Sequence, residues 1–328
     1  MLRRTLFIDN RSYQGYQNMN DELSDLINQF LEYLEIEKNC SKLTIRDYRH
    51  YLDVFNKWFS TTSHGKTLET LDLATIRKYR VFLANRADAK GLTLMRVTQN
   101  YYVIALRSFL RFLIKNDHKT LEPSKIDLPR TESRSLKFLE KEQVDRLVTA
   151  TDTSKEDGLR DRAIMELLFS TGLRVSELVG LNRDKINLER REFGVIGKGG
   201  KSRLVFVSSS AAEWIKRYLD KREDSFKPLF IRYSGAVIQE NGGEKMRLTA
   251  RSIERLVKKY VRSARIPVDA TVHTLRHSFA TDLLTNGADI RSVQEMLGHK
   301  NIATTQIYTH ITNKQLHDVH KSFHSGNK

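Results

Sequence analysis

The chain has 328 residues, with 56 Lys and Arg against 40 Asp and Glu, so its formal net charge is +16 at pH 7. This length suits about two domains, and the single cysteine, Cys40, excludes an intramolecular disulfide or a cysteine-rich zinc module. The apolar runs are too short for a membrane span or a signal peptide, which favours a cytoplasmic protein. A positive balance of this size is typical of proteins that bind a polyanion, usually nucleic acid. The alternative is a soluble protein that is merely basic.

The first part of the chain is predicted to be a small all-α domain. Residues 1–18 are polar and are expected to form a flexible tail. After them, apolar residues recur at three- and four-residue spacing, which is typical of amphipathic helices. Further helices are predicted from about Ser41, from about Asp72 and over residues 93–115. We therefore expect four helices in residues 19–118, with no convincing strand.

The second part begins after a break in this helical pattern. Pro123 and Pro129 lie in a polar, charged stretch, so residues 119–135 are predicted to be a linker. Residues 136–328 then form a second, mainly helical domain. Its predicted helices include residues 140–150, residues 157–170, a segment from about residue 249, and residues 289–297, capped by Asp289 and stopped by Gly298.

A small antiparallel sheet is predicted inside this second domain. Glu192–Ile196 and Arg203–Ser208 have strand-like composition, and Gly197–Lys201 between them is typical of a tight hairpin turn. Phe226–Ile231 is a candidate third strand, and Gly235–Gly243 is predicted to be a loop. The fold class is therefore mainly α, in two domains, with a small sheet in the second.

Five short segments contain residues suited to a phosphate ligand. They are Thr171–Leu178, Gly197–Lys201, His273–Ser278, Leu297–His299 and Thr304–His310. Each alone is a weak signal, because a surface arginine is usually a solvated charge and a single histidine usually makes a structural hydrogen bond. In this order and at these spacings, however, they resemble the tyrosine recombinase family, the phage-type integrases. Within it they most resemble the Xer-like recombinases.

The resemblance covers nearly the whole chain and implies roles for seven residues. The matching positions are the catalytic Arg174, Lys198, His273, Arg276, His299 and Tyr308 and the supporting acid Glu177. The family's two-part plan implies a helical, SAM-like core-binding domain over residues 19–118 and a catalytic domain over residues 136–328. Together these two domains are expected to form a C-shaped clamp around DNA.

The chemistry of these residue types agrees with that reading. Strand exchange without an energy source needs the phosphodiester energy to be stored, and a covalent ester on Tyr308 stores it. A free tyrosine has a pKa near 10, so this hydroxyl needs help from its site. The guanidiniums of Arg174 and Arg276 are suited to clamp the non-bridging phosphate oxygens and to stabilise the extra charge of the transition state.

The remaining catalytic positions divide the other tasks. Lys198, on a glycine-flanked hairpin tip, is expected to protonate the leaving 5′-oxygen, and His299 to hydrogen-bond the scissile phosphate. Glu177 lies one helical turn from Arg174 and is expected to orient a cationic neighbour. No carboxylate cluster suited to Mg²⁺ is apparent, so a two-metal nuclease is disfavoured and no metal or other cofactor is expected.

Basic side chains of the predicted helices are candidates for non-catalytic DNA contacts, mainly to phosphates. The candidates are Lys42, Arg46, Arg49, Arg77, Arg107 and Arg111 in the first domain and Lys201 on the hairpin. The alternative for each of them is a solvated charge on an outer helix face.

The expected partner is a double-stranded DNA recombination site, bound by a homotetramer that holds two duplexes. Residues 313–323 are predicted to form a C-terminal helix with Leu316, Val319, His320 and Phe323 on one face. The resemblance implies that this helix docks into a neighbouring protomer, and the alternative is that it folds onto its own domain. A cytoplasmic, nucleoid-associated location is expected, without membrane contact.

The predicted function is site-specific DNA recombination through a 3′-phosphotyrosine intermediate and a Holliday junction. A type IB topoisomerase shares this chemistry and is the alternative enzyme. A basic DNA-binding protein that has lost catalysis is the alternative from another class. The intact set of seven residues argues against the second alternative. The target DNA sequence does not follow from these residues.

Overall fold

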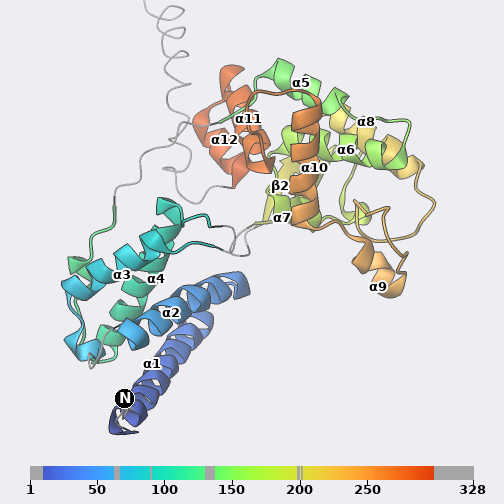
Figure 1. Ribbon diagram of the computed structural model, residues 1–328. Coiled ribbons are helices and arrows are strands. Elements are labelled where there is room, and N and C mark those ends of the chain that lie inside the picture. The colour runs from blue at the N-terminus through green and yellow to red at the C-terminus, as the bar shows by residue number, and fades with distance from the viewer. Residues whose placement is uncertain are drawn as a thin grey trace, which may run out of the picture. The chain divides into compact units, whose positions relative to one another are not determined.

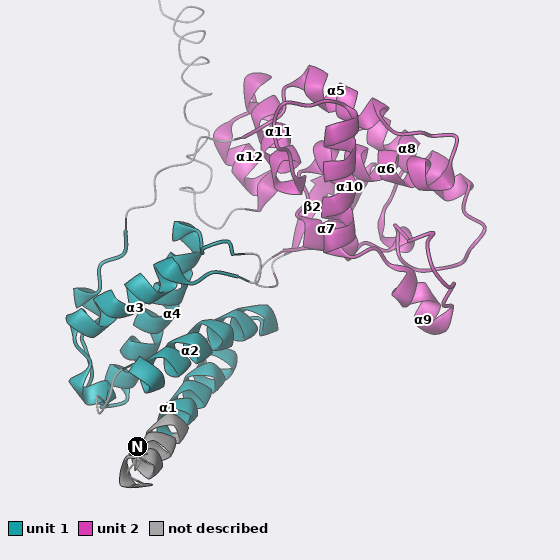
Figure 2. Cartoon of the chain, viewed as in Figure 1, with its two compact units in different colours: residues 1–133 teal, residues 134–328 magenta. Residues whose placement is uncertain are grey.

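The computed structural model contains two compact units, residues 1–133 and residues 134–328 (Figures 1 and 2). The structure describes residues 10–62, 67–88, 91–129, 137–197, 200 and 202–298, with side chains from Glu22 onward. The division between the units falls inside the stretch 119–135. The predicted C-shaped clamp stays a prediction.

The regular elements of unit 1 in its described part are all helical. Its elements are α1 (Asn10–Ile36), α2 (Lys42–Thr62), the 3₁₀ turn η1 (Leu68–Thr70), α3 (Leu73–Asn85), α4 (Arg96–Lys115) and the 3₁₀ turn η2 (Pro123–Lys125). The predicted caps are present: Thr44 N–H donates to Ser41 Oγ at 3.2 Å and Thr75 N–H donates to Asp72 Oδ1 at 2.7 Å. These bonds satisfy backbone donors that a helix start leaves unpaired.

Helix α1 begins earlier than the sequence pattern predicted. It starts at Asn10, so its backbone extends into the segment 1–18 that was expected to be a tail. A helix that has already nucleated gains one hydrogen bond for each added residue, and residues 10–18 contain no proline to prevent this. The apolar pattern therefore predicts the part of α1 that packs on the core, but not the full length of the helix.

The predicted linker is also shorter than expected, because its first part packs on unit 1. Ile126 is only 2% exposed within the core of unit 1. The turn η2 before it is held by Arg107, whose Nε donates to the carbonyl of Pro123 at 3.1 Å. An apolar side chain and a carbonyl acceptor thus attach this segment to α4, although its prolines and charges resemble those of a linker.

Unit 2 is mainly helical, with one small sheet. Its helices are α5 (Lys141–Thr149), α6 (Glu156–Thr171), α7 (Val175–Val179), α8 (Ser209–Asp220), α9 (Glu240–Gly243), α10 (Ala250–Ser263), α11 (Val272–Thr285) and α12 (Ile290–Leu297), with 3₁₀ turns at Arg183–Lys185 and Glu244–Met246. Strands β1 (Glu192–Ile196) and β2 (Ser202–Phe206) pair antiparallel, with Ile196 opposite Ser202. The predicted hairpin is therefore present.

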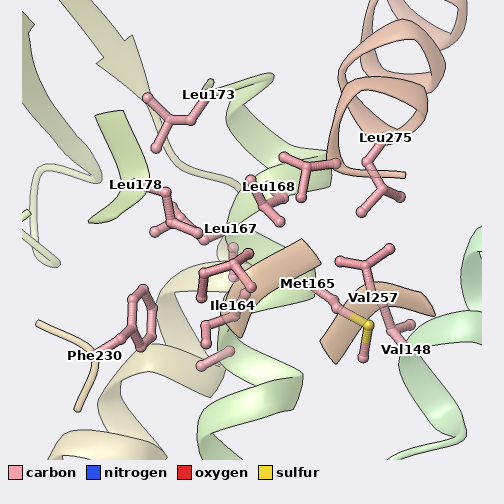
Figure 3. Packing of buried hydrophobic residues seen from close by; sticks show 14 of the residues in the cluster. Val148, Ile164, Met165, Leu167, Leu168, Leu173, Leu178, Phe230, Val257 and Leu275 are labelled. Atoms are coloured by element: carbon pink, nitrogen blue, oxygen red, sulfur yellow. The ribbon is translucent and has the colours of Figure 1, made fainter. Parts of the chain in front are cut away.

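Helix α6 lies at the centre of the core of unit 2. Its Ile164, Leu167 and Leu168 are at most 1% exposed, and they pack in one cluster with Leu178 of α7 and Leu275 of α11 (Figure 3). A helix that is apolar on most of its faces is expected to be surrounded by other elements. The core thereby anchors α6, α7 and α11, which carry the motif residues, to one another.

The candidate third strand is not formed in the described part of unit 2. The segment Phe226–Ile231 makes only isolated bridges, Asn182 to Pro228 and Ile231 to Arg247. Pro228 has no N–H to donate to a strand ladder. Arg222 Nη1 donates hydrogen bonds to the carbonyls of Pro228 and Leu229 at 2.9 and 2.8 Å. The buried guanidinium satisfies backbone groups that a strand partner would otherwise bind.

Candidate active site

The first motif lies where α6 ends and α7 begins. Gly172 adopts φ +59° and ends α6, and a Cβ added there would lie 2.5 Å from Cδ1 of Phe279, so the turn requires glycine. Arg174 then occupies the position before α7. Its backbone N–H donates to Glu177 Oε2 at 2.8 Å, and its Nη1 donates to Glu177 Oε1 at 2.9 Å. The acid three residues later therefore holds both the backbone and the guanidinium of Arg174.

Glu177 is shared between two arginines. Its side chain is only 4% exposed, and Arg203 of β2 donates to both of its oxygens, from Nη1 at 2.8 Å and from Nη2 at 2.9 Å. Burial alone would raise the pKa of this carboxyl. The hydrogen bonds from Arg203 and from the backbone of Arg174, with the charges of both guanidiniums, outweigh burial and hold its pKa at about 2. The carboxylate is therefore charged at neutral pH.

The His-x-x-Arg pair lies on the first turns of α11. Thr271 caps this helix by accepting from Thr274 N–H at 3.3 Å, and the three-residue spacing puts His273 and Arg276 on one face. Arg276 is 2% exposed. Its Nη1 donates to the carbonyl of Gly172 and its Nη2 to the carbonyl of Leu297. Arg276 thus joins the end of α6 to the end of α12.

Two histidine rings lie beside these cations. His273 and His277 meet edge to face, with ring centroids 4.5 Å apart. Desolvation and the positive charges of Arg276 and Arg174 lower the pKa of His273, although this residue reaches the surface. Burial and the neighbouring His273 and Arg276 lower the pKa of His277 to about 4. Both rings are therefore expected to be neutral at pH 7.

The lowered pKa of His277 predicts a pH-dependent stability. An unfolded histidine has a pKa near 6.5, so the unfolded chain binds the proton first as the pH falls. The contribution is fully present above pH 6.5 and is lost as the pH falls toward 4. We expect His277→Asn to reduce the drop in melting temperature between pH 7 and pH 5, with His118→Asn in unit 1 as the control. An equal drop in both variants would contradict this prediction.

Four of the seven predicted site residues are thus brought together, and three lie outside the described residues. Arg174, Glu177, His273 and Arg276 gather where α6, α7 and α11 meet. The three site residues outside the described part are Lys198, His299 and Tyr308. Lys201 and the predicted helix 313–323 lie outside it as well. The described chain leads directly to two of these positions. Strands β1 and β2 enclose residues 197–201, and α12 ends at Leu297, two residues before His299.

The DNA-contact candidates of unit 1 have mixed surroundings. Lys42, Arg46 and Arg49 follow one another on α2 and are exposed. Arg46 forms an ion pair with Asp47 at 2.8 Å, and the Arg46 side chain is 70% exposed. Surface ion pairs of this kind are weak, so Arg46 can exchange this partner for a phosphate. The other two exposed candidates are Arg77 on α3 and Arg111 on α4. Arg107 is half-buried and donates to a carbonyl, so it contributes to structure as well.

Sequence reasoning missed Arg203. The sequence pattern places it in the second strand and predicts no role at the site, although its side chain is 10% exposed and contacts Glu177. One signal was available: a cation at an inward-facing position of a short strand needs a buried partner. The identity of that partner, 26 residues earlier in the chain, does not follow from local pattern.

Comparisons with known proteins match both parts of the chain to one family. The model of the phage integrase family matches residues 137–315, and that of the phage integrase N-terminal SAM-like domain matches residues 27–117. The chain is 39% identical over 306 residues to tyrosine recombinase XerD of Lacticaseibacillus casei, covering 91% of this chain and 98% of the relative. It is 34% identical over 313 residues to tyrosine recombinase XerC of Bacillus subtilis, covering 93% and 97%.

The chain therefore belongs to the phage integrase family, whose members of this kind are tyrosine recombinases. Within that family it is a site-specific DNA recombinase of the Xer type, as the resemblance predicted. The alternatives, a topoisomerase and a silent DNA-binding protein, are not favoured.

Solved structures give the same fold. The XerH recombinase bound to a palindromic difH substrate has a TM-score of 0.66 at 22% identity, covering 98% of this chain and 91% of that chain. The Tn1549 transposon integrase with transposon right-end DNA has a TM-score of 0.67 at 20% identity, covering 91% and 99%. The predicted mainly α fold with a SAM-like first domain and a small sheet is confirmed. Among the described helices, none has the length and apolar character needed to cross a membrane.

Proposed function

We propose that the chain exchanges DNA strands at a specific site by forming a 3′-phosphotyrosine bond, releasing a 5′-hydroxyl and passing through a Holliday junction. The observation that carries this proposal is the pair of guanidiniums, Arg174 and Arg276, held by Glu177 and by backbone carbonyls at the junction of α6, α7 and α11. Groups fixed before the substrate arrives stabilise a developing charge without the cost of reorganisation.

The residues divide the phosphoryl transfer between them. The guanidiniums bind the non-bridging oxygens, and neutral His273 hydrogen-bonds the phosphate from the same helix face as Arg276. The start of α11 adds a partial positive charge that favours an anion. Lys198 protonates the leaving oxygen, His299 hydrogen-bonds the phosphate and Tyr308 attacks it. These roles rest on the family motif and on the described cations.

The two domains share the work of binding DNA in this proposal. Residues 19–118 form the core-binding domain, residues 136–328 the catalytic domain, and the exposed basic residues of α2 contact phosphates. Solved complexes of similar fold hold DNA: the XerH complex contains its difH substrate, and a lambda integrase dimer is bound to a core site. A DNA substrate also supports the cytoplasmic, nucleoid-associated location, which stays a prediction.

A homotetramer with exchanged C-terminal helices is the proposed working assembly. An apolar groove of about 230 Å³ lies between β2 and helices α6, α11 and α12 of unit 2. It is lined among others by Leu204, Phe206, Phe279, Leu283 and Met296, and the first two are about half exposed. Its proposed occupant is residues 313–323 of a neighbouring copy, whose apolar residues recur on one helical face. Such head-to-tail docking closes into a ring of four.

Deleting residues 313–328 is expected to leave binding of a single half-site nearly intact and to impair cooperative assembly and recombination. The DNA contacts remain, but the link between protomers is lost. Phe206→Glu in the groove is expected to reproduce the assembly defect, whereas Val237→Glu, at a 66% exposed apolar residue elsewhere in unit 2, is expected to have no effect. Gel shifts with one and two half-sites measure cooperativity. Unchanged cooperativity in both the deletion and the groove variant would contradict the exchange.

The proposed function is tested on a supercoiled plasmid. The DNA site is first obtained by sequencing the DNA that the purified protein binds, and two copies are placed in one plasmid. We expect recombinant products and, in denaturing gels, a covalent protein–DNA adduct. Topoisomers without recombinants would indicate a relaxing enzyme, and site binding without any adduct would indicate a DNA-binding protein that lacks catalysis.

A further inference from the structure

Arg203 makes contacts that no other described residue of the site combines. Its Nη1 and Nη2 donate to the two oxygens of Glu177, and its Nε donates to the carbonyl of Met296 at 3.0 Å. The side chain is 10% exposed. One guanidinium therefore joins β2, α7 and the end of α12.

Each of these three segments leads to a different part of the active site. Lys198 is five residues before Arg203 in the chain. Glu177 holds Arg174. Met296 is three residues before His299. A plane of three directed donors fixes both distance and orientation between such segments, which a single ammonium group does not do.

The end of α12 is held by two arginines rather than one. The carbonyl of Met296 accepts from Arg203 and the next carbonyl, of Leu297, accepts from Arg276. Both cations lie at the negative end of the helix dipole, where positive charge is favoured. The chain then passes against Arg203 itself, because a Cβ added at Gly298 would lie 3.1 Å from Arg203 Cδ.

Stability alone does not account for this arrangement. A buried ion pair recovers little more than its desolvation cost, and a well-packed apolar residue usually stabilises a core as well or better. The directed contacts of Arg203 instead determine where the Glu177 carboxylate lies and how strongly its two oxygens can bind Arg174. Without Arg203, Arg174 would be the one cationic hydrogen-bond partner of that carboxylate among the described residues, and the carboxylate would draw its guanidinium closer.

We propose that Arg203 is a positioning residue for phosphoryl transfer: it holds Glu177 so that Arg174 faces the phosphate, and it ties the hairpin and the end of α12 to the same point. This inference rests on the proposed function. It requires that losing Arg203 slows the cleavage step and leaves DNA affinity nearly unchanged, because both terminal nitrogens of Arg203 donate to Glu177 rather than to the phosphate.

The experiment compares Arg203 with a matched arginine. Arg222 also lies in unit 2, has a fully buried side chain, and pairs through two nitrogens with one carboxylate, Asp224, while donating to backbone carbonyls. It contacts no motif residue in these bonds. The variants are Arg203→Met, Arg203→Lys, Arg222→Met and Arg222→Lys in the full chain, together with Glu177→Gln and the double variant Arg203→Met with Glu177→Gln.

Three quantities are measured for each variant: the melting temperature, the dissociation constant for a nicked half-site, and the single-turnover rate of covalent adduct formation at a temperature where the protein is folded. We expect Arg203→Met to lower the adduct rate by about 10²-fold, the size of effect that a displacement of about 1 Å at a reacting group produces. Its dissociation constant should stay close to that of the wild type. Arg203→Lys should not restore the rate.

The control and the double variant separate positioning from folding. The Arg222 variants should lower the melting temperature and cleave near the wild-type rate. The double variant should be no slower than the slower single variant, since both changes act on one carboxylate. If either Arg203 variant cleaves at the wild-type rate, or the Arg222 variants lose as much rate as the Arg203 variants, the inference is wrong. A wild-type protein that forms no adduct would instead overturn the proposed function itself.

Discussion

Tyr308→Phe is expected to bind its DNA site with nearly wild-type affinity and to form no covalent adduct. The motif puts this tyrosine nine residues after His299, at the position of the nucleophile, and phenylalanine lacks the hydroxyl that attacks phosphorus. Affinity is retained because the cations that meet the phosphate are unchanged. Gel shifts measure binding, and denaturing gels after incubation with nicked DNA measure the adduct.

The control for this prediction is a tyrosine of unit 2 outside the motif. Tyr233→Phe makes the same chemical change at a residue that is 38% exposed, and it is expected to leave adduct formation intact. Adduct formation by Tyr308→Phe at the wild-type rate would show that another residue is the nucleophile. A loss of adduct in both variants would point to a defect in folding rather than in the reaction.

The second large effect is expected for Lys198→Ala. The sequence puts Lys198 in the segment that connects β1 to β2, from which a lysine is expected to reach the leaving 5′-oxygen. Loss of a general acid typically slows a reaction about 10²–10⁴-fold. A substrate with sulfur at the 5′-bridging position needs little protonation on leaving, so it should recover most of the lost rate. Rates of single-turnover cleavage on the oxygen and sulfur substrates measure the effect.

Lys201→Ala is the matched control, since it removes a lysine from the same turn. It is expected to be milder on the oxygen substrate and to show little relative gain with sulfur. Equal slowing of Lys198→Ala on both substrates would assign this lysine to phosphate binding instead of proton transfer. This test is linked to Arg203, because Lys198 is five residues before Arg203 in the chain and Arg203 lies on β2.

Helix ends were well predicted wherever they depend on a few neighbouring residues. The caps at Ser41, Asp72 and Asp289 are present, and Gly298 adopts φ +65° at the end of α12. Each of these features is a hydrogen bond or a backbone angle that one residue and its next few neighbours decide. Two features were not predicted: α1 starts early because a nucleated helix extends through residues that carry no apolar pattern, and Ile126 is attached to unit 1 by tertiary packing.

The sequence by itself determined the family, the motif residues and the mainly helical fold, because spacing along the chain records helix periodicity, caps and the order of reacting groups. Only the tertiary structure decided that Glu177 serves two arginines, that Arg276 rests on the carbonyls of Gly172 and Leu297, and that Phe226–Ile231 is not a strand. The physical reason is distance along the chain. Buried charges and carbonyls must find partners, and which partner lies within hydrogen-bonding distance depends on how α6, α7, α11, α12 and the hairpin pack around one core.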